Sequence, residues 1–191
     1  MDYERINNIL KEGGVIAFVT DTVWGLGCLP TCETAVKKIY EIKNREAKKP
    51  LILMSHDIYP LLDYIKQPVE KNAQMLIKRH FPGALTVVIE KSERTPDYIT
   101  SGMYTVGIRV PANKTFADIC RNIEGGVLAT TSANISGEPP ALSYEEAVNY
   151  IGDKADLVIP SEGYEAQGIA STVVGFNNGE TVVYRQGIIH V

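Results

Sequence analysis

The amino-acid sequence predicts an α/β fold built on a mixed parallel and antiparallel sheet. Short apolar runs that are typical of buried strands alternate along the chain with amphipathic stretches of helical period. The last two strand-like runs flank Asn178-Gly179, a dipeptide typical of hairpin turns, so at least one strand pair should be antiparallel. No linker, repeat or low-complexity tract interrupts residues 1–191, which we therefore expect to form a single domain.

Composition argues against several classes of protein. A hydrophobic share of 45% in 191 residues is sufficient for a folded core. No apolar run reaches 18 residues and the amino terminus is charged, so we expect neither a membrane span nor a secretory signal. The three cysteines lack a C-x-x-C pair and the three histidines are scattered, which predicts free thiols, no metal site and a cytoplasmic location. The net charge of −4 argues against a general nucleic-acid coat but leaves a local basic groove possible.

In the amino-terminal half, each element follows from its hydrophobic period and from its start and stop signals. Residues 3–12 carry apolar side chains at helical spacing and end at Gly13-Gly14, a C-cap signal. Residues 15–19 are typical of a buried strand, and Thr31 is the expected N-cap of a helix that runs to residue 42. The sequence then predicts a strand over 51–54, a short helix capped by Asp57, a helix over 69–80 and a strand over 84–89.

The carboxyl-terminal half continues the alternation. Ser143 and Glu146 form a capping box that should open a helix. The other elements expected here are a polar loop over 91–104, a strand over 106–110, a helix around 116–123, a strand over 126–129, a strand over 157–159, a glycine-bearing loop over 160–170, and a closing strand pair over 171–174 and 181–184.

Two polar stretches come directly after predicted strands. Thr20, Asp21 and Thr22 follow the first strand, and residues 130–137 place four hydroxyls and one amide after the strand over 126–129. Ligands of α/β proteins bind beyond the carboxyl ends of strands, and short neutral donors suit a phosphate or a ribose. The alternative is that each stretch is only a turn, because Ser, Asn and Gly are common in turns.

Basic residues supply the charge that an anionic ligand would need. Lys43, Arg45 and Lys49 follow the second helix, where they could neutralise a polyphosphate or simply form a solvated helix end. Arg109 interrupts an apolar strand and Arg185 precedes Gly187; each could face solvent or hold a carboxylate in a groove. The sequence contains no Ser-His-Asp set, no paired acid and base carboxylates and no P-loop. This inventory favours a reaction driven by positioning and charge stabilisation over a covalent nucleophile.

Seven short segments match, in order, the motifs of a known family. They are residues 20–26, 43–45 with 49–51, 82–86, 107–111, 132–137, 171–174 and 185–187. On these segments the chain resembles the YrdC-like family of threonylcarbamoyl-adenylate synthases, in its short form without an extra carboxyl-terminal domain. Each segment is a weak signal alone, whereas seven in family order across nearly the whole chain are a strong one.

The resemblance implies a twisted mixed sheet with helices around an open basic cavity. It also implies an enzyme, a nucleotidyltransferase that makes threonylcarbamoyl-AMP and pyrophosphate from L-threonine, bicarbonate or carbon dioxide, and ATP with Mg²⁺. The product would pass to the machinery that modifies adenosine 37 of tRNA. The resemblance implies these roles: Lys43 and Arg45 as catalytic; Lys43, Arg45, Lys49, Ser132, Asn134, Ser136 and Arg185 for the nucleotide; and Thr20, Thr22, Arg109 and Ser171 for the threonine.

Three positions depart from the family pattern. Trp24 stands where a tyrosine is usual, Asn113 where a histidine is frequent, and Gly175 where an aspartate is frequent. Weak RNA binding is a further expected property of such an enzyme. Two other functions are less favoured. One is an RNA-binding accessory factor with a basic groove, against which the acidic total and the absence of an aromatic-basic RNA motif count. The other is a carbamoyl-transfer module of hydrogenase maturation, which would add zinc-finger cysteine pairs and further domains that this sequence does not show.

Overall fold

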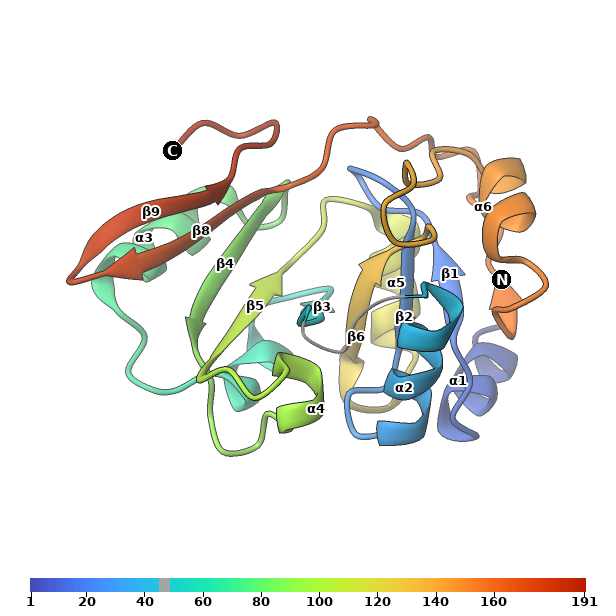
Figure 1. The fold of residues 1–191 in the computed structure, drawn as a ribbon, viewed down its shortest axis with the longest axis horizontal. Helices are drawn as coiled ribbons and strands as arrows, with labels where there is room; N and C mark the ends of the chain where they lie inside the picture. Colours follow the sequence, from blue (N-terminus) through green and yellow to red (C-terminus); the bar gives the residue numbers. More distant parts are fainter. Residues whose placement is uncertain (45–48) are drawn as a thin grey trace.

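One nine-stranded sheet organises the molecule. The structure is a computed structural model that describes residues 1–44 and 49–191. Its strands lie in the order β7-β1-β2-β6-β3-β5-β4-β8-β9 (Figure 1). They are β1 (Ile16–Phe18), β2 (Gly25–Cys28), β3 (Ile52–Ser55), β4 (Leu85–Glu90), β5 (Thr105–Arg109), β6 (Val127–Ser132), β7 (Leu157–Val158), β8 (Thr172–Asn177) and β9 (Glu180–Arg185). The pairs β1·β7, β3·β5 and β4·β8 are parallel and the other five are antiparallel, which confirms the predicted mixed sheet.

Helices cover both faces of this sheet. They are α1 (Tyr3–Lys11), α2 (Glu33–Ile42), α3 (Lys71–His80), α4 (Asp97–Thr100), α5 (Lys114–Arg121) and α6 (Tyr144–Ile151), with 3-10 turns at Tyr59–Tyr64 and Glu124–Gly126. Successive residues of a strand point to opposite faces. Ile16 and Phe18 of β1 therefore pack with α1 and α5, where the Phe18 and Phe116 ring centroids lie 5.0 Å apart, whereas Ala17 packs with α2 and α6.

Several local predictions are confirmed in atomic detail. The Ser143 hydroxyl accepts a hydrogen bond from Glu146 N at the start of α6, and the Glu146 carboxylate accepts one from Leu142 N. Asn178 and Gly179, both with positive φ, turn the chain from β8 to β9.

Asn113, one of the departures from the family pattern, is the N-cap of α5 and accepts a hydrogen bond from Phe116 N at 2.9 Å. No helix in the described ranges is long and apolar enough to cross a membrane.

Four local predictions need correction. The N-cap of α2 is Cys32 rather than Thr31, and it makes no side-chain capping bond. The short helix that Asp57 was expected to cap is the 3-10 turn Tyr59–Tyr64, whose N-cap is Ile58, although the Asp57 carboxylate does accept a hydrogen bond from Tyr59 N. The polar segment 91–104 contains the short helix α4, and β6 continues through Ser132, so three of the polar residues expected after that strand lie on it.

The strand β2 was not predicted, because two of its four residues are glycines, which disfavour strands. The structure shows why they are there. A Cβ atom on Gly25 would lie 2.6 Å from Cε2 of Phe18, and one on Gly27 would lie 3.0 Å from Cε1 of the same ring. The buried Phe18 ring therefore occupies the space that side chains at these two positions of β2 would need.

Candidate active site

A cavity of about 380 Å³ opens over the middle of the sheet. Six of the residues that the sequence predicts for the site line it: Thr20, Thr22, Arg109, Ser132, Ser171 and Arg185. They come from segments more than 150 residues apart, brought together by the strand order. Within the described part of the chain, the lining contains two arginines and no aspartate or glutamate, so the cavity suits an anionic ligand.

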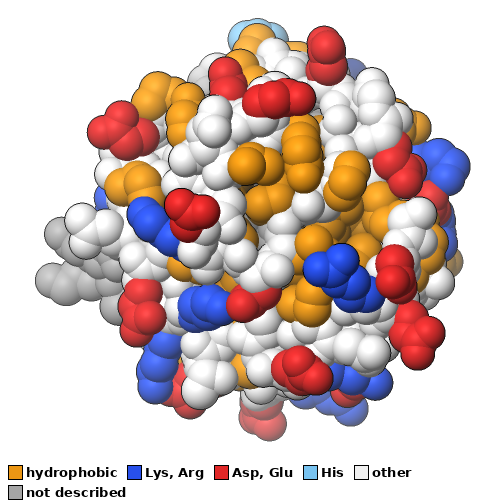
Figure 2. All heavy atoms as spheres, turned by 90° about the vertical axis from the view of Figure 1, so that its right-hand side faces the viewer, with side chains coloured by type: hydrophobic (Ala, Val, Ile, Leu, Met, Phe, Trp, Pro, Cys, Tyr) orange, Lys and Arg blue, Asp and Glu red, His pale blue; other side chains and the backbone are white. Residues whose placement is uncertain are grey.

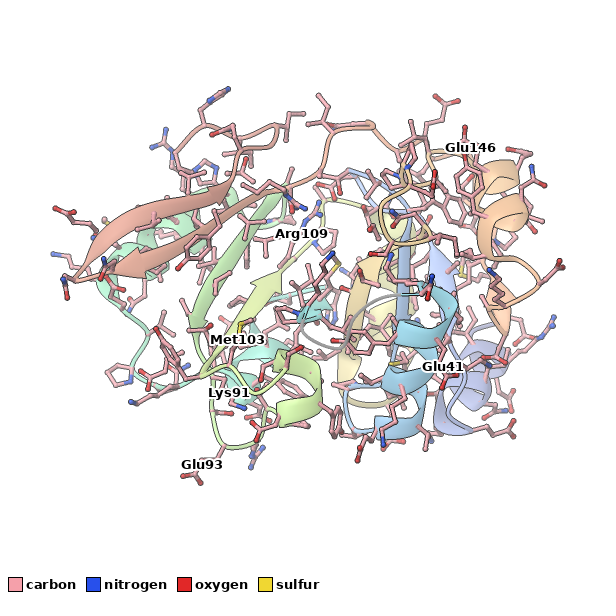
Figure 3. The ribbon with its side chains drawn as sticks, in the orientation of Figure 1. Glu41, Lys91, Glu93, Met103, Arg109 and Glu146 are labelled. Carbon is pink, nitrogen blue, oxygen red and sulfur yellow. The ribbon has the colours of Figure 1, made fainter. Side chains whose placement is uncertain are left out.

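Arg109 lies at the carboxyl end of β5, toward the middle of the sheet (Figure 3). Its side chain is buried, and all three guanidinium nitrogens donate hydrogen bonds. Nε donates to Gly83 O at 3.0 Å, Nη1 to Thr22 Oγ1 at 2.9 Å and Nη2 to Asp21 Oδ1 at 2.5 Å. Burial lowers the pKa of Arg109 and the Asp21 carboxylate offsets this only in part, but an arginine stays charged at neutral pH in either case. The solvent-facing alternative for Arg109 is thereby excluded.

The polar turn after β1 is both a turn and part of the cavity wall. Thr20 Oγ1 donates to Val23 O at 2.6 Å and accepts from Thr22 N at 3.2 Å. Because the Thr20 hydrogen points to Val23, the Thr22 hydroxyl must be the donor in the 3.1 Å contact between the two hydroxyls. Thr22 Oγ1 is then oriented to accept from Arg109, so this turn fixes the arginine from one side.

Arg185, at the end of β9, lies beside Ser171. Its Nε and Nη2 donate to Ser171 O at 3.1 and 2.8 Å, and Nη2 also approaches Ser171 Oγ at 3.1 Å. The Ser171 hydroxyl in turn lies 2.8 Å from Thr86 Oγ1, whose buried side chain lines the cavity. The structure thus groups Arg185, predicted for the nucleotide, with Ser171, predicted for the threonine. Thr86 was missed as a site residue; its place in the matched segment 82–86, just after Pro82-Gly83, was the available signal.

Lys43 directly follows α2 and is 1% exposed. Its ammonium donates to Ser132 O at 2.5 Å, Asn134 O at 2.7 Å and Asn134 Oδ1 at 2.8 Å. The Lys43 carbonyl accepts from Ser136 N at 2.8 Å. A solvated helix end is therefore excluded for this lysine, which joins the end of α2 to the loop after β6.

The remaining predicted nucleotide residues are placed differently. Ser132 Oγ donates to Asn134 Oδ1 at 2.6 Å, and Asn134 Nδ2 donates to Glu138 O, so these two side chains help to close the loop. Of the two, Ser132 lines the cavity. Lys49 is exposed, and its carbonyl accepts from Tyr40 Oη at 2.8 Å. Arg45 lies outside the described residues.

The side chains that line the cavity do not resemble the ligands of a metal ion that is held by the protein alone. Among the residues that the structure describes, no group of three His, Cys, Asp or Glu side chains could hold a metal ion. The cavity lining instead offers hydroxyls and guanidinium groups. Hard cations such as Mg²⁺ prefer carboxylate, carbonyl and phosphate oxygens, so a Mg²⁺ ion here would depend on oxygens that a ligand brings.

Comparisons with known proteins agree with the resemblance seen in the sequence. Residues 8–187 match the Sua5–YciO–YrdC family model, which carries the description "Telomere recombination". The chain is 38% identical over 180 residues to threonylcarbamoyl-AMP synthase of Pyrococcus abyssi, covering 93% of this chain and 52% of that relative. It is 33% identical over 158 residues to the enzyme of the same name from Idiomarina loihiensis, covering 82% and 84%. That name denotes a nucleotidyltransferase.

A solved structure agrees as well. The crystal structure of P. abyssi Sua5 complexed with L-threonine superposes with a TM-score of 0.90 at 35% identity, covering 97% of this chain and 54% of that one. The chain thus spans about half the length of the archaeal relative and most of the bacterial one. A match to the family model over 180 consecutive residues, together with relatives above 30% identity, shows that the chain belongs to the Sua5–YciO–YrdC family.

Proposed function

We propose that this protein is an L-threonylcarbamoyl-adenylate synthase, which makes threonylcarbamoyl-AMP and pyrophosphate from L-threonine, bicarbonate or carbon dioxide, and ATP. The observation that carries the proposal is that Thr20, Thr22, Arg109, Ser132, Ser171 and Arg185 line the same cavity. The names of the curated relatives and the L-threonine complex of P. abyssi Sua5 support it.

Arg109 is the proposed partner of the threonine carboxylate. A guanidinium group has five N–H bonds, and three of them point to Gly83, Thr22 and Asp21. One N–H then remains on each terminal nitrogen, which is the number that a bidentate carboxylate takes. Thr20, Thr22 and Ser171 add hydroxyls around the same part of the cavity for the polar groups of the amino acid.

The nucleotide would lie on the Ser132 side of the cavity. In this proposal Ser132, at the end of β6, and Asn134 and Ser136, in the loop after it, receive the nucleotide, and Lys43 holds this segment through three hydrogen bonds. Arg45, Lys49 and Arg185 would neutralise phosphate charge. Mg²⁺ would enter with the ATP phosphates, as part of the substrate rather than on protein carboxylates.

The chemistry needs positioning and charge stabilisation. The threonine amine is first carboxylated to a carbamate, and a carbamate oxygen then attacks the α-phosphorus of ATP while pyrophosphate leaves. Negative charge develops on the phosphoryl oxygens and on the leaving group, where fixed cations lower the barrier most. Arg185 is a described cation on the cavity wall, and Arg45 is the catalytic residue proposed for this step. The catalytic role expected for Lys43 needs correction, because its ammonium donates to protein oxygens and does not line the cavity, so we propose that it acts through the loop that it holds. The product would then serve the machinery that modifies tRNA.

The decisive measurement is ATP-dependent pyrophosphate release by the purified protein. We expect release to require both L-threonine and bicarbonate, and threonylcarbamoyl-AMP to accumulate in a ratio of one to one with pyrophosphate. Release that continues unchanged when threonine is omitted would contradict the proposal. The alternative of an RNA-binding accessory factor predicts the reverse, namely binding of tRNA without any threonine-dependent turnover.

A further inference from the structure

We propose that Asp21 is a positioning residue for the amino-acid substrate, and that it acts through Arg109 rather than by touching the substrate. The inference rests on the proposed function, because it takes Arg109 as the partner of the threonine carboxylate. It adds a residue for which sequence reasoning found no role, although Asp21 is the one acid within the matched polar turn.

The contact is a nearly buried ion pair. Asp21 Oδ1 lies 2.5 Å from Arg109 Nη2, and the two side chains are 9% and 3% exposed. Of the three oxygens that Arg109 reaches, the other two belong to a backbone carbonyl and a hydroxyl, so Asp21 supplies the only negative charge among them. Asp21 itself does not line the cavity, whereas Arg109 does, so any effect of Asp21 on a ligand passes through the arginine.

The three anchors together fix the direction of the guanidinium plane. A carboxylate binds a guanidinium best in a planar, two-bond arrangement, so the affinity depends on the direction of the remaining N–H bonds. A buried cation that loses its counter-charge is strongly disfavoured and turns toward water. For Arg109, the accessible water lies in the cavity, where the turned side chain would occupy the substrate position. Misplacement of a binding group by about 1 Å can cost about a hundredfold in rate.

Removal of Asp21 would also have a second effect, which would raise rather than lower the affinity for threonine. Asp21 also cancels part of the positive charge of Arg109, so its removal would strengthen the attraction for any carboxylate. Two substitutions separate the effects. Asp21→Asn removes the charge and keeps an oxygen that can accept from Nη2, whereas Asp21→Ala removes both. Positioning predicts that Asp21→Ala is the more harmful of the two, and charge cancellation predicts that both variants bind threonine more tightly.

The test is L-threonine binding by isothermal titration calorimetry, alongside the Michaelis constants for threonine and for ATP. For Asp21→Ala we expect threonine affinity to fall about tenfold to a hundredfold, as for the loss of a charge-assisted hydrogen bond. For Asp21→Asn we expect a smaller loss, and for both variants a KM for ATP within about twofold of the wild type. A purely structural role would instead lower thermal stability and change both substrates alike.

A matched control exists at the edge of the sheet. Asp156 accepts hydrogen bonds from Lys38 Nζ and from Val15 N, so Asp156→Ala also removes a carboxylate that joins a cation to the fold. It should lower the melting temperature without a specific change in threonine affinity. Unchanged or tighter threonine binding by Asp21→Ala would overturn the inference. Wild-type protein that binds threonine but releases no pyrophosphate would contradict the proposed function alone, because the calorimetric comparison needs no turnover.

Discussion

At the end of α2, the Lys43 ammonium lies within hydrogen-bond distance of three oxygens of residues 132–134. We expect Lys43→Ala to destabilise the fold by about 1.5–3 kcal/mol, because buried oxygens that accept from a charged donor would lose it. The same substitution should also weaken ATP use by loosening the loop around Ser132. Urea unfolding of the variant and the wild type measures the first effect, and the KM for ATP the second.

Lys49→Ala is the control for this substitution. Lys49 is exposed, so its removal should change stability by less than about 0.5 kcal/mol. Equal unfolding midpoints for Lys43→Ala and Lys49→Ala would show that the Lys43 contacts contribute nothing measurable. The position of Lys43 after a helix suggested a solvated end or a phosphate ligand, and a single sequence offers no signal that the lysine turns inward to a loop 90 residues away.

Cysteine reactivity gives a second test at the residue scale. Cys28 and Cys120 are buried, and burial raises the pKa of both thiols, so they stay protonated at neutral pH. Cys32 is half-buried at the start of α2. We therefore expect an alkylating reagent to modify Cys32 alone in the native protein and all three thiols after unfolding. Mass spectrometry of the labelled peptides measures this, and rapid native labelling of Cys28 or Cys120 would contradict the burial.

The sequence indicated which residues are candidates for the site, but it did not indicate which residues they bond to. The guanidinium of Arg109 was recognised as a candidate carboxylate ligand, because an arginine inside an apolar strand requires an explanation. Its pairing with Asp21 joins residues 88 positions apart, and no local pattern indicates such a contact. Thr86 was missed as a site residue for a similar reason, since a threonine is an ordinary strand residue until the face of the strand is known.

At the scale of the element, β2 depends on the absence of side chains at Gly25 and Gly27. We expect Gly25→Ala to destabilise the fold by about 1–3 kcal/mol, since its Cβ would lie 2.6 Å from the Phe18 ring. That ring is fully buried against Phe116 and has little room to move. Chemical denaturation of the single variants and of Gly25→Ala with Phe18→Leu measures the coupling. If the clash is the cause, the double variant should be more stable than the sum of the two losses indicates.

The elements with local signals were the ones that could be predicted. The box of Ser143 and Glu146 and the turn at Asn178-Gly179 act within four residues, and both are confirmed. By contrast, β2 forms by pairing with β1 and β6, and its glycines are required because a phenylalanine from another strand fills the space beside them. The end of β6 was also missed, because residues 130–132 are polar yet pair in register with β2, and Thr130 pairs with β3 as well. Sheet pairing there overrides the composition of the segment.

At the scale of the whole molecule, the positive charge of the cavity depends on where the charged side chains lie rather than on the net charge of the protein. On the face that carries α6 and the amino terminus, acidic and basic side chains alternate around exposed hydrophobic ones, with no continuous basic surface (Figure 2). The cavity lining, in contrast, holds two arginines and no acid among its described residues. A protein with a net charge of −4 can therefore still offer a cationic site to a small anionic ligand.

The cavity wall also determines which amino acid the proposed enzyme prefers. L-threonine and L-serine differ by one methyl group, and the apolar side chains of Val23 and Val173 line the cavity. A methyl-sized difference in a pocket is worth about 1–3 kcal/mol, or roughly 10–200-fold in specificity. We therefore expect serine to react with a lower kcat/KM than threonine but measurably, because the carboxylate that Arg109 is proposed to bind is common to both.

Truncating the wall should reduce this preference. Val173→Ala removes the methyl groups that a threonine methyl would contact, so the ratio of kcat/KM for threonine over serine should fall toward one. Leu26→Ala is the matched control, since Leu26 is fully buried in the core and does not line the cavity; it should lower stability and leave the ratio unchanged. Competition assays with both amino acids measure the ratio directly. A wild-type ratio near one would mean that the valines do not contact the substrate methyl. A ratio that falls equally in both variants would show that general loosening of the fold, rather than this wall, sets the preference.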